Sequence, residues 1–189
     1  MGKASISYPQ VLPSAVKSQM LKRKKPSIYL AGPIYGNLEW RKDFIEKLEA
    51  ESISDFDVYT PQGKAGTVEE SAKYGNITYD ISDQTDWETF CMYIADVIVF
   101  CVPPMNYYID DYARETRFEL GEWINKIDYS NGIDGDDKQI YIWMSHKLSG
   151  KNYIINRIKS NPSDYVHLFD DRSDMIVELA KYINSKAAK

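Results

Sequence analysis

The stretch Ala95-Asp-Val-Ile-Val-Phe-Cys-Val102 decides the fold. An unbroken apolar run follows Asp96, and Pro103 and Pro104 stop it. A short continuous apolar run that is rich in β-branched residues and bounded by turn signals is typical of a strand buried on both faces of a parallel sheet. We therefore predict that residues 95–102 form a central strand.

Strand-like and helix-like segments alternate on both sides of this run. Short apolar runs of strand length occupy residues 27–32, 56–61, 139–144 and 165–169. Segments with helical patterns occupy residues 38–52, 77–94, 113–127, 153–159 and 173–185, with Ser173 as the expected cap of the last. This alternation predicts an α/β fold, a doubly wound parallel sheet of five strands with helices on both faces. Such sheets bind ligands at the carboxyl ends of their strands, which here selects the loops 32–38, 61–76 and 103–119.

The length of 189 residues suits one globular domain. Residues 1–26 lack apolar periodicity, so we expect a flexible arm there and a single catalytic domain over residues 27–189. No signal-peptide core and no run near the ~20 apolar residues of a membrane helix is present, which favours a cytoplasmic protein without membrane contact. Cys91 and Cys101 lack disulfide or zinc spacing and are expected to be buried small hydrophobic residues.

The formal net charge of −5 and the pI near 5.1 argue against a nucleic-acid duplex as the main partner. The basic run at residues 22–25 is the contrary feature, and such runs are more often solvated flanks than binding arms. A small-molecule partner is the better expectation.

Glu119 lies in Glu115-Thr-Arg-Phe-Glu-Leu-Gly121, at the start of the helix that follows the central strand. A carboxylate near a helix N-terminus lies in a positive field that keeps it ionised, and a carboxylate nucleophile must be ionised. The alternative is that Glu119 belongs to the solvated face of an ordinary helix. Gly121 favours the first interpretation, because a helical glycine costs about 1 kcal/mol against alanine and so indicates a close approach.

Five segments occur in the order seen in one family. They are Ile28-Tyr-Leu-Ala-Gly-Pro33, Trp40-Arg41, Trp87-Glu88, residues 95–100 and Thr116-Arg-Phe-Glu-Leu-Gly121. Together they make residues 27 to about 125 similar to the nucleoside 2-deoxyribosyltransferase superfamily, in particular its deoxyribosyltransferase-like branch.

The resemblance implies a role for each matching residue. Glu119 matches the glutamate that attacks C1′ of deoxyribose, and Tyr29 matches a tyrosine that orients it. Glu88 stands where the family has an aspartate that protonates the leaving base; its chemistry is the same, and the competing interpretation is a surface glutamate beside a core tryptophan. The family also has an aspartate that binds the sugar 3′-hydroxyl, and Asp110 or Asp111 could serve in this role.

The remaining expected substrate contacts lie in the same loops and beside the same motifs. They are Gly32, Pro33, Ile34, Tyr35, Trp40, Trp87 and Arg117, with the two tryptophans as stacking surfaces for a base and Arg117 as a possible phosphate contact.

General chemistry gives the same division of labour. Cleavage of a glycosidic bond through an oxocarbenium-like transition state needs an ionised carboxylate under the sugar and a proton donor at the leaving group. We expect Glu119 to have a low pKa and Glu88 a raised one. This chemistry requires no metal and no cofactor.

Three functions remain open from the sequence. The first is transfer of deoxyribose between bases, the second is hydrolysis of a 2′-deoxynucleoside 5′-monophosphate, and the third is a non-catalytic nucleotide-binding sensor. The resemblance implies a deoxynucleoside or deoxynucleotide and a free base as partners. The resemblance also implies a homo-oligomer, with the tyrosine-rich loop 105–111 at or near a subunit contact.

Overall fold

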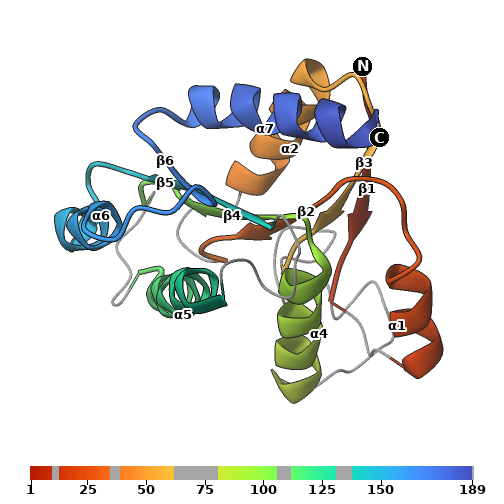
Figure 1. The fold of residues 1–189 in the computed structure, drawn as a ribbon, viewed down its shortest axis with the longest axis horizontal. Helices are drawn as coiled ribbons and strands as arrows, with labels where there is room; N and C mark the ends of the chain where they lie inside the picture. Colours follow the sequence, from red (N-terminus) through yellow and green to blue (C-terminus); the bar gives the residue numbers. More distant parts are fainter. Residues whose placement is uncertain (10–12, 35–38, 62–80, 106–111, 131–137, 189) are drawn as a thin grey trace.

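The computed structural model describes residues 1–9, 13–34, 39–61, 81–105, 112–130 and 138–188 (Figure 1). In this part of the chain six parallel strands form one sheet in the order β1-β3-β2-β4-β5-β6. The strands are β1 (Ala4–Ser7), β2 (Ser27–Ala31), β3 (Phe56–Tyr59), β4 (Val97–Val102), β5 (Gln139–Met144) and β6 (Val166–Phe169). The prediction of a parallel α/β sheet with a buried central strand is confirmed, because β4 is buried along its whole length.

Helices cover both faces of the sheet (Figure 1). One layer holds α2 (Trp40–Glu51) and α7 (Arg172–Ala187), and the other holds α1 (Ser14–Met20), α4 (Ile81–Ile94), α5 (Arg114–Ser130) and α6 (Lys151–Lys159). Each layer has its own apolar core. Side chains that alternate along the strands divide between them, so Ile98 packs toward α4 and α5 whereas Val97 and Val99 pack toward α2 and α7.

The prediction of five strands was wrong, because the sixth comes from the N-terminal residues. Strand β1 pairs with β3 along its length, from Ala4 beside Phe56 to Ser7 beside Tyr59. Its sequence Ala-Ser-Ile-Ser has one large apolar residue, and its side chains are partly buried or exposed. A four-residue edge strand of this composition carries no apolar period that the sequence could show.

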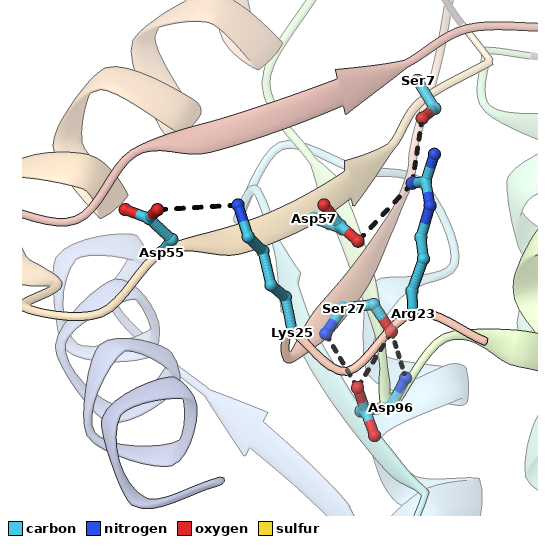
Figure 2. Close-up of polar contacts among 7 residues, drawn as sticks. All are labelled: Ser7, Arg23, Lys25, Ser27, Asp55, Asp57 and Asp96. Carbon is cyan, nitrogen blue, oxygen red and sulfur yellow. Dashed lines mark hydrogen bonds and ion pairs between the residues drawn. The ribbon is translucent and has the colours of Figure 1, made fainter. Parts of the chain in front are cut away.

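Residues 1–26 are therefore not a flexible arm where the structure describes them. Arg23 Nη1 lies 3.5 Å from Asp57 Oδ2 and donates a hydrogen bond to Ser7 Oγ at 3.4 Å (Figure 2). Lys25 Nζ lies 3.5 Å from Asp55 Oδ2 in the same view. Two cations of the basic run thus face acidic residues at β3, and this chain segment is fastened to the sheet.

Asp96, just before β4, completes this end of the sheet. Its Oδ2 accepts hydrogen bonds from the backbone nitrogen of Ser27 at 2.7 Å and from Ser27 Oγ at 2.9 Å (Figure 2). These bonds join the amino ends of β2 and β4, opposite the end where ligands bind in such folds.

Three smaller expectations have clear outcomes. Cys91 and Cys101 are buried free thiols, as predicted. The expected cap Ser173 is wrong by two residues: Asp171 is the cap of α7, and its side chain accepts from the Ser173 backbone nitrogen at 2.6 Å. Within the described residues, none of the helices has the length and apolar character needed to cross a membrane.

Candidate active site

The candidate site lies at the topological switch point of the sheet. From β2 the chain moves to β3 on one side and then returns across β2 to β4 on the other. The crevice between the carboxyl ends of β2 and β4 is where doubly wound sheets bind ligands. Tyr29 comes from β2, Glu88 from α4 before β4, and Glu119 from α5 after it.

These three side chains interact electrostatically although they come from separate elements. The negative charge of Glu88 raises the pKa of Glu119, and the charges of Glu88 and Glu119 both raise the pKa of Tyr29. Such couplings require short distances in a partly buried space. The fold therefore brings together the three residues that the sequence selected.

Glu119 has a raised pKa, not the low value that its place after β4 predicted. Burial first, and then the charge of Glu88, raise the pKa of Glu119 from 4.5 to about 8. The helix begins at Arg114, so Glu119 lies in its second turn, where the field of the helix end has faded. Glu115, in the first turn, has the lowered pKa expected of that position because a backbone hydrogen bond stabilises its charge.

The expectation of a raised pKa for Glu88 is confirmed. Burial is the largest cause, and it outweighs two opposing effects. Gln84 Nε2 donates a hydrogen bond to Glu88 Oε1 at 2.7 Å, and the charge of Arg41 also favours the ionised form. Glu88 is consequently a candidate proton donor beside Glu119.

The turn after β2 is held by the start of α2. Trp40 Nε1 donates to the Pro33 carbonyl at 3.0 Å, and Arg41 donates to the carbonyls of Pro33 and Gly32 at 2.9 and 2.6 Å. A Cβ at Gly32 would collide with the Cys101 carbonyl and the Trp40 ring. Glycine is therefore required at position 32 by packing.

Trp40 and Trp87 do not offer ring surfaces to a ligand in this structure. Trp40 is 2% exposed and Trp87 is fully buried, with the Trp87 ring 6.4 Å from that of Tyr29. Their predicted role as stacking surfaces is not what the structure shows. Large aromatic side chains bury more apolar area than any others, and both tryptophans contribute to the cores that support the site.

Of the other expected substrate contacts, the structure describes Ile34 and Arg117. Ile34 is partly buried beside Pro33, and Arg117 is partly buried with its Nε 3.4 Å from the carbonyl of Ala113 in its own helix. Tyr35, Asp110 and Asp111 lie outside the described residues, as does most of the tyrosine-rich loop. The prediction of a close packing neighbour at Gly121 was wrong, because nothing lies within 4 Å of a Cβ placed there.

Two features of the site were missed by the sequence analysis. Arg41, which the sequence showed only as part of the Trp40-Arg41 motif, is 3% exposed. Ala113 has a φ of 59°, in the left-handed region that non-glycine residues rarely adopt, directly before α5. Beside it the Tyr112 hydroxyl donates to the Pro103 carbonyl at 2.8 Å and ties the start of α5 to the end of β4.

The described residues contain no group of three or more His, Cys, Asp or Glu side chains placed to hold a metal ion. What they place at the switch point is a pair of interacting carboxyl groups with a buried tyrosine and a buried arginine. In general, an ionised carboxylate can act as a nucleophile and a protonated carboxyl group can donate a proton.

The strand order and the helices on both faces make this a doubly wound α/β protein with two interacting carboxyl groups. The family described as "Nucleoside 2-deoxyribosyltransferase like" matches residues 25–130, more than half of the chain, and the chain belongs to this family. No curated protein matches the sequence closely enough to count as a relative.

Proposed function

We propose that the protein cleaves the N-glycosidic bond of a 2′-deoxyribonucleoside through a covalent glycosyl intermediate on Glu119, and transfers the deoxyribose to a second base. The observation that carries this proposal is the electrostatic coupling of Glu119 with Glu88 at the switch point of a chain in this family. Glycoside chemistry by carboxyl pairs supports the assignment of roles.

In the first step an ionised Glu119 oxygen forms a bond to C1′ while the bond between C1′ and the base nitrogen breaks. The electron pair of the broken bond goes to the base, and Glu88 supplies the proton that neutralises it. In the second step a nitrogen of the acceptor base attacks C1′, the ester bond to Glu119 breaks, and Glu88 takes up the proton of the acceptor.

These two reaction steps need one proton on the carboxyl pair. Both carboxyl groups have raised pKa values, and the pKa of Glu119 is about 8, so the pair retains one proton in the neutral range. The reactive form places that proton on Glu88 and the charge on Glu119. Tyr29 is buried and the charges of both groups raise its pKa, and in this proposal it orients Glu119.

The test is chromatography of products from a panel of 2′-deoxynucleosides and their 5′-monophosphates, each with and without a free acceptor base. Transfer predicts exchanged nucleosides only when an acceptor is present. Release of free base and sugar phosphate from the monophosphates would instead identify the hydrolase. Binding of the panel without any product would identify the non-catalytic module and contradict the proposal.

The matched controls come from the same helix. Glu119→Gln keeps the shape of the side chain and removes its charge, so it should abolish product formation. Glu122→Gln removes an exposed carboxylate that pairs with Lys126 at 2.6 Å, and it should remain active. Equal activity of the two variants would remove Glu119 from the mechanism.

A further inference from the structure

Arg41 is the buried cation of the site. It lies in the first turn of α2, is 3% exposed, and donates through Nη1 to the Pro33 carbonyl and through Nη2 to the Gly32 carbonyl. A guanidinium group presents such donors in a rigid fork, which a lysine ammonium does not. Its two nitrogens therefore fix the backbone turn that ends β2, directly after the strand that carries Tyr29.

The plane of the Arg41 guanidinium group is also fixed, by contact with an aromatic ring. Its guanidinium carbon lies 4.3 Å from the centroid of the Trp40 ring, and Trp40 Nε1 donates to the Pro33 carbonyl that Arg41 also contacts. This contact, with the hydrogen bonds to the turn, leaves the guanidinium little freedom of position.

Burying a cation is costly unless negative charge lies close by. Burial lowers the pKa of Arg41 to about 10, which leaves it charged at neutral pH. The groups that face it are Tyr29 on β2, Cys101 on β4, Glu88 on α4 and Glu119 on α5, with Tyr112 ahead of α5. In turn, the charge of Arg41 lowers the pKa of Glu88 and of Glu119 against the effect of burial.

We propose that Arg41 is a positioning residue for the reaction proposed above, because it fixes the Gly32–Pro33 turn and places a fixed positive charge beside Glu88 and Glu119. The inference rests on the proposed function for its catalytic consequence. Its electrostatic part concerns the folded protein alone and is measurable without turnover.

The experiment compares Arg41→Gln, Arg41→Lys and the control Lys42→Gln, an exposed neighbour on the same helix. Each is measured by the pH profile of kcat/KM, by thermal unfolding, and by carbon NMR titration of labelled glutamate side chains, with Glu119→Gln used to assign the Glu119 signal. Glu115 and Glu122 also face Glu119 from α5 and are unchanged in every variant.

Removing the positive charge raises the pKa of both carboxyl groups, so Arg41→Gln should move both limbs of the profile to higher pH. It should also lower kcat/KM on the acidic limb, where a shift of one pKa unit changes the ionised fraction about tenfold. Arg41→Lys should have the wild-type pH profile, since it keeps the positive charge. It should not have the full rate, since lysine lacks the two nitrogens that donate to the Gly32–Pro33 turn. Lys42→Gln should match the wild type.

The outcomes separate the two proposals. A Glu119 titration shifted upward in Arg41→Gln, in a protein without turnover, supports this inference while the proposed function fails. An unshifted titration in a folded Arg41→Gln overturns the inference. If Arg41→Gln does not fold, the decision rests on Arg41→Lys. If the activity per folded molecule of Arg41→Lys equals that of the wild type, the positioning role is overturned.

Discussion

The charge state of the site depends on two carboxyl groups that share one partly buried space, Glu88 and Glu119. A helix end stabilises a nearby negative charge by about 0.3–1 kcal/mol and only within the first turn. Burial shifts a carboxyl pKa by up to several units, each worth about 1.4 kcal/mol. Burial therefore decides the pKa of Glu119, whereas a backbone hydrogen bond is the main cause of the lowered pKa of Glu115.

Glu119 should make the stability of the fold depend on pH. Its pKa is raised from 4.5 to about 8 on folding, so its stabilising contribution is complete below the lower value and is lost as pH rises through the higher one. Thermal unfolding measured from pH 4.5 to 8.5 should show a smaller loss of stability for Glu119→Gln than for the wild type. Parallel curves for the two proteins would mean that burial does not perturb this carboxyl group.

Glu88 should control the basic limb of the activity profile. The wild type should show a bell-shaped profile of kcat/KM whose basic limb has an apparent pKa near 8, where the pair loses its last proton. Glu88→Gln leaves one carboxyl group that must be ionised, so only a rising limb should remain. It should slow substrates with poor leaving bases most, and a bell that persists in this variant would assign the proton donor elsewhere.

At the scale of elements, two glycines in the candidate region have opposite environments. Gly32 ends β2 against the Cys101 carbonyl and the Trp40 ring, whereas Gly121 lies exposed in α5 with open space beside it. The turn after β2 therefore depends on close packing. The second turn of α5 does not.

Alanine at each position should give opposite changes in stability. Gly32→Ala forces Trp40 or the turn to move and should destabilise by about 1–3 kcal/mol. Gly121→Ala should stabilise by up to about 1 kcal/mol, because alanine is the better helix former and meets no obstacle. Urea unfolding measures both, and a Gly32→Ala protein as stable as the wild type would contradict the packing described at the turn.

The sequence predicted well those elements whose apolar pattern is set by burial. Residues 139–144 coincide with β5, and β4 lies within the predicted run, because strands buried on both faces are apolar throughout. β1 was not predicted, because an edge strand that pairs mainly through its backbone needs no apolar pattern.

At the site, the sequence could select the candidate residues and the raised pKa of Glu88, but not the rest of their environment. Glu119, Glu88 and Tyr29 stood out through motifs, and the fold brings them together. Their pKa values, the burial of Trp40 and the inward position of Arg41 depend on packing between distant segments. No local pattern encodes that packing, since an arginine in a first helical turn is exposed in most proteins.

At the scale of the whole molecule, the N-terminal residues complete the sheet and one of its cores. β1 covers the edge of β3, Met20 of α1 is buried in the core that includes Tyr59, and Arg23 pairs with Asp57, whose side chain is only 6% exposed (Figure 2). Removing these residues opens a sheet edge and leaves a buried carboxylate without this partner.

A fragment of residues 27–189 should consequently be much less stable than the full chain. The ion pair itself contributes about 1 kcal/mol or less, because Arg23 is 38% exposed, so most of the loss should come from the buried Met20 side chain and the uncovered edge of β3. The control is the full chain with Lys22→Gln and Lys24→Gln, which removes exposed charges of the same basic run and should keep wild-type stability. A fragment that unfolds at the same urea concentration as the full chain would support the interpretation of residues 1–26 as a flexible arm.

The proposed mechanism requires a covalent bond between Glu119 and the sugar, which rapid-quench mass spectrometry can detect. Protein mixed with a deoxynucleoside that it turns over, quenched in acid and digested, should carry one deoxyribosyl group on the peptide that contains Glu119. The Glu119→Gln protein should carry none. Steady turnover with no modified peptide, or the same modification in Glu119→Gln, would contradict the account.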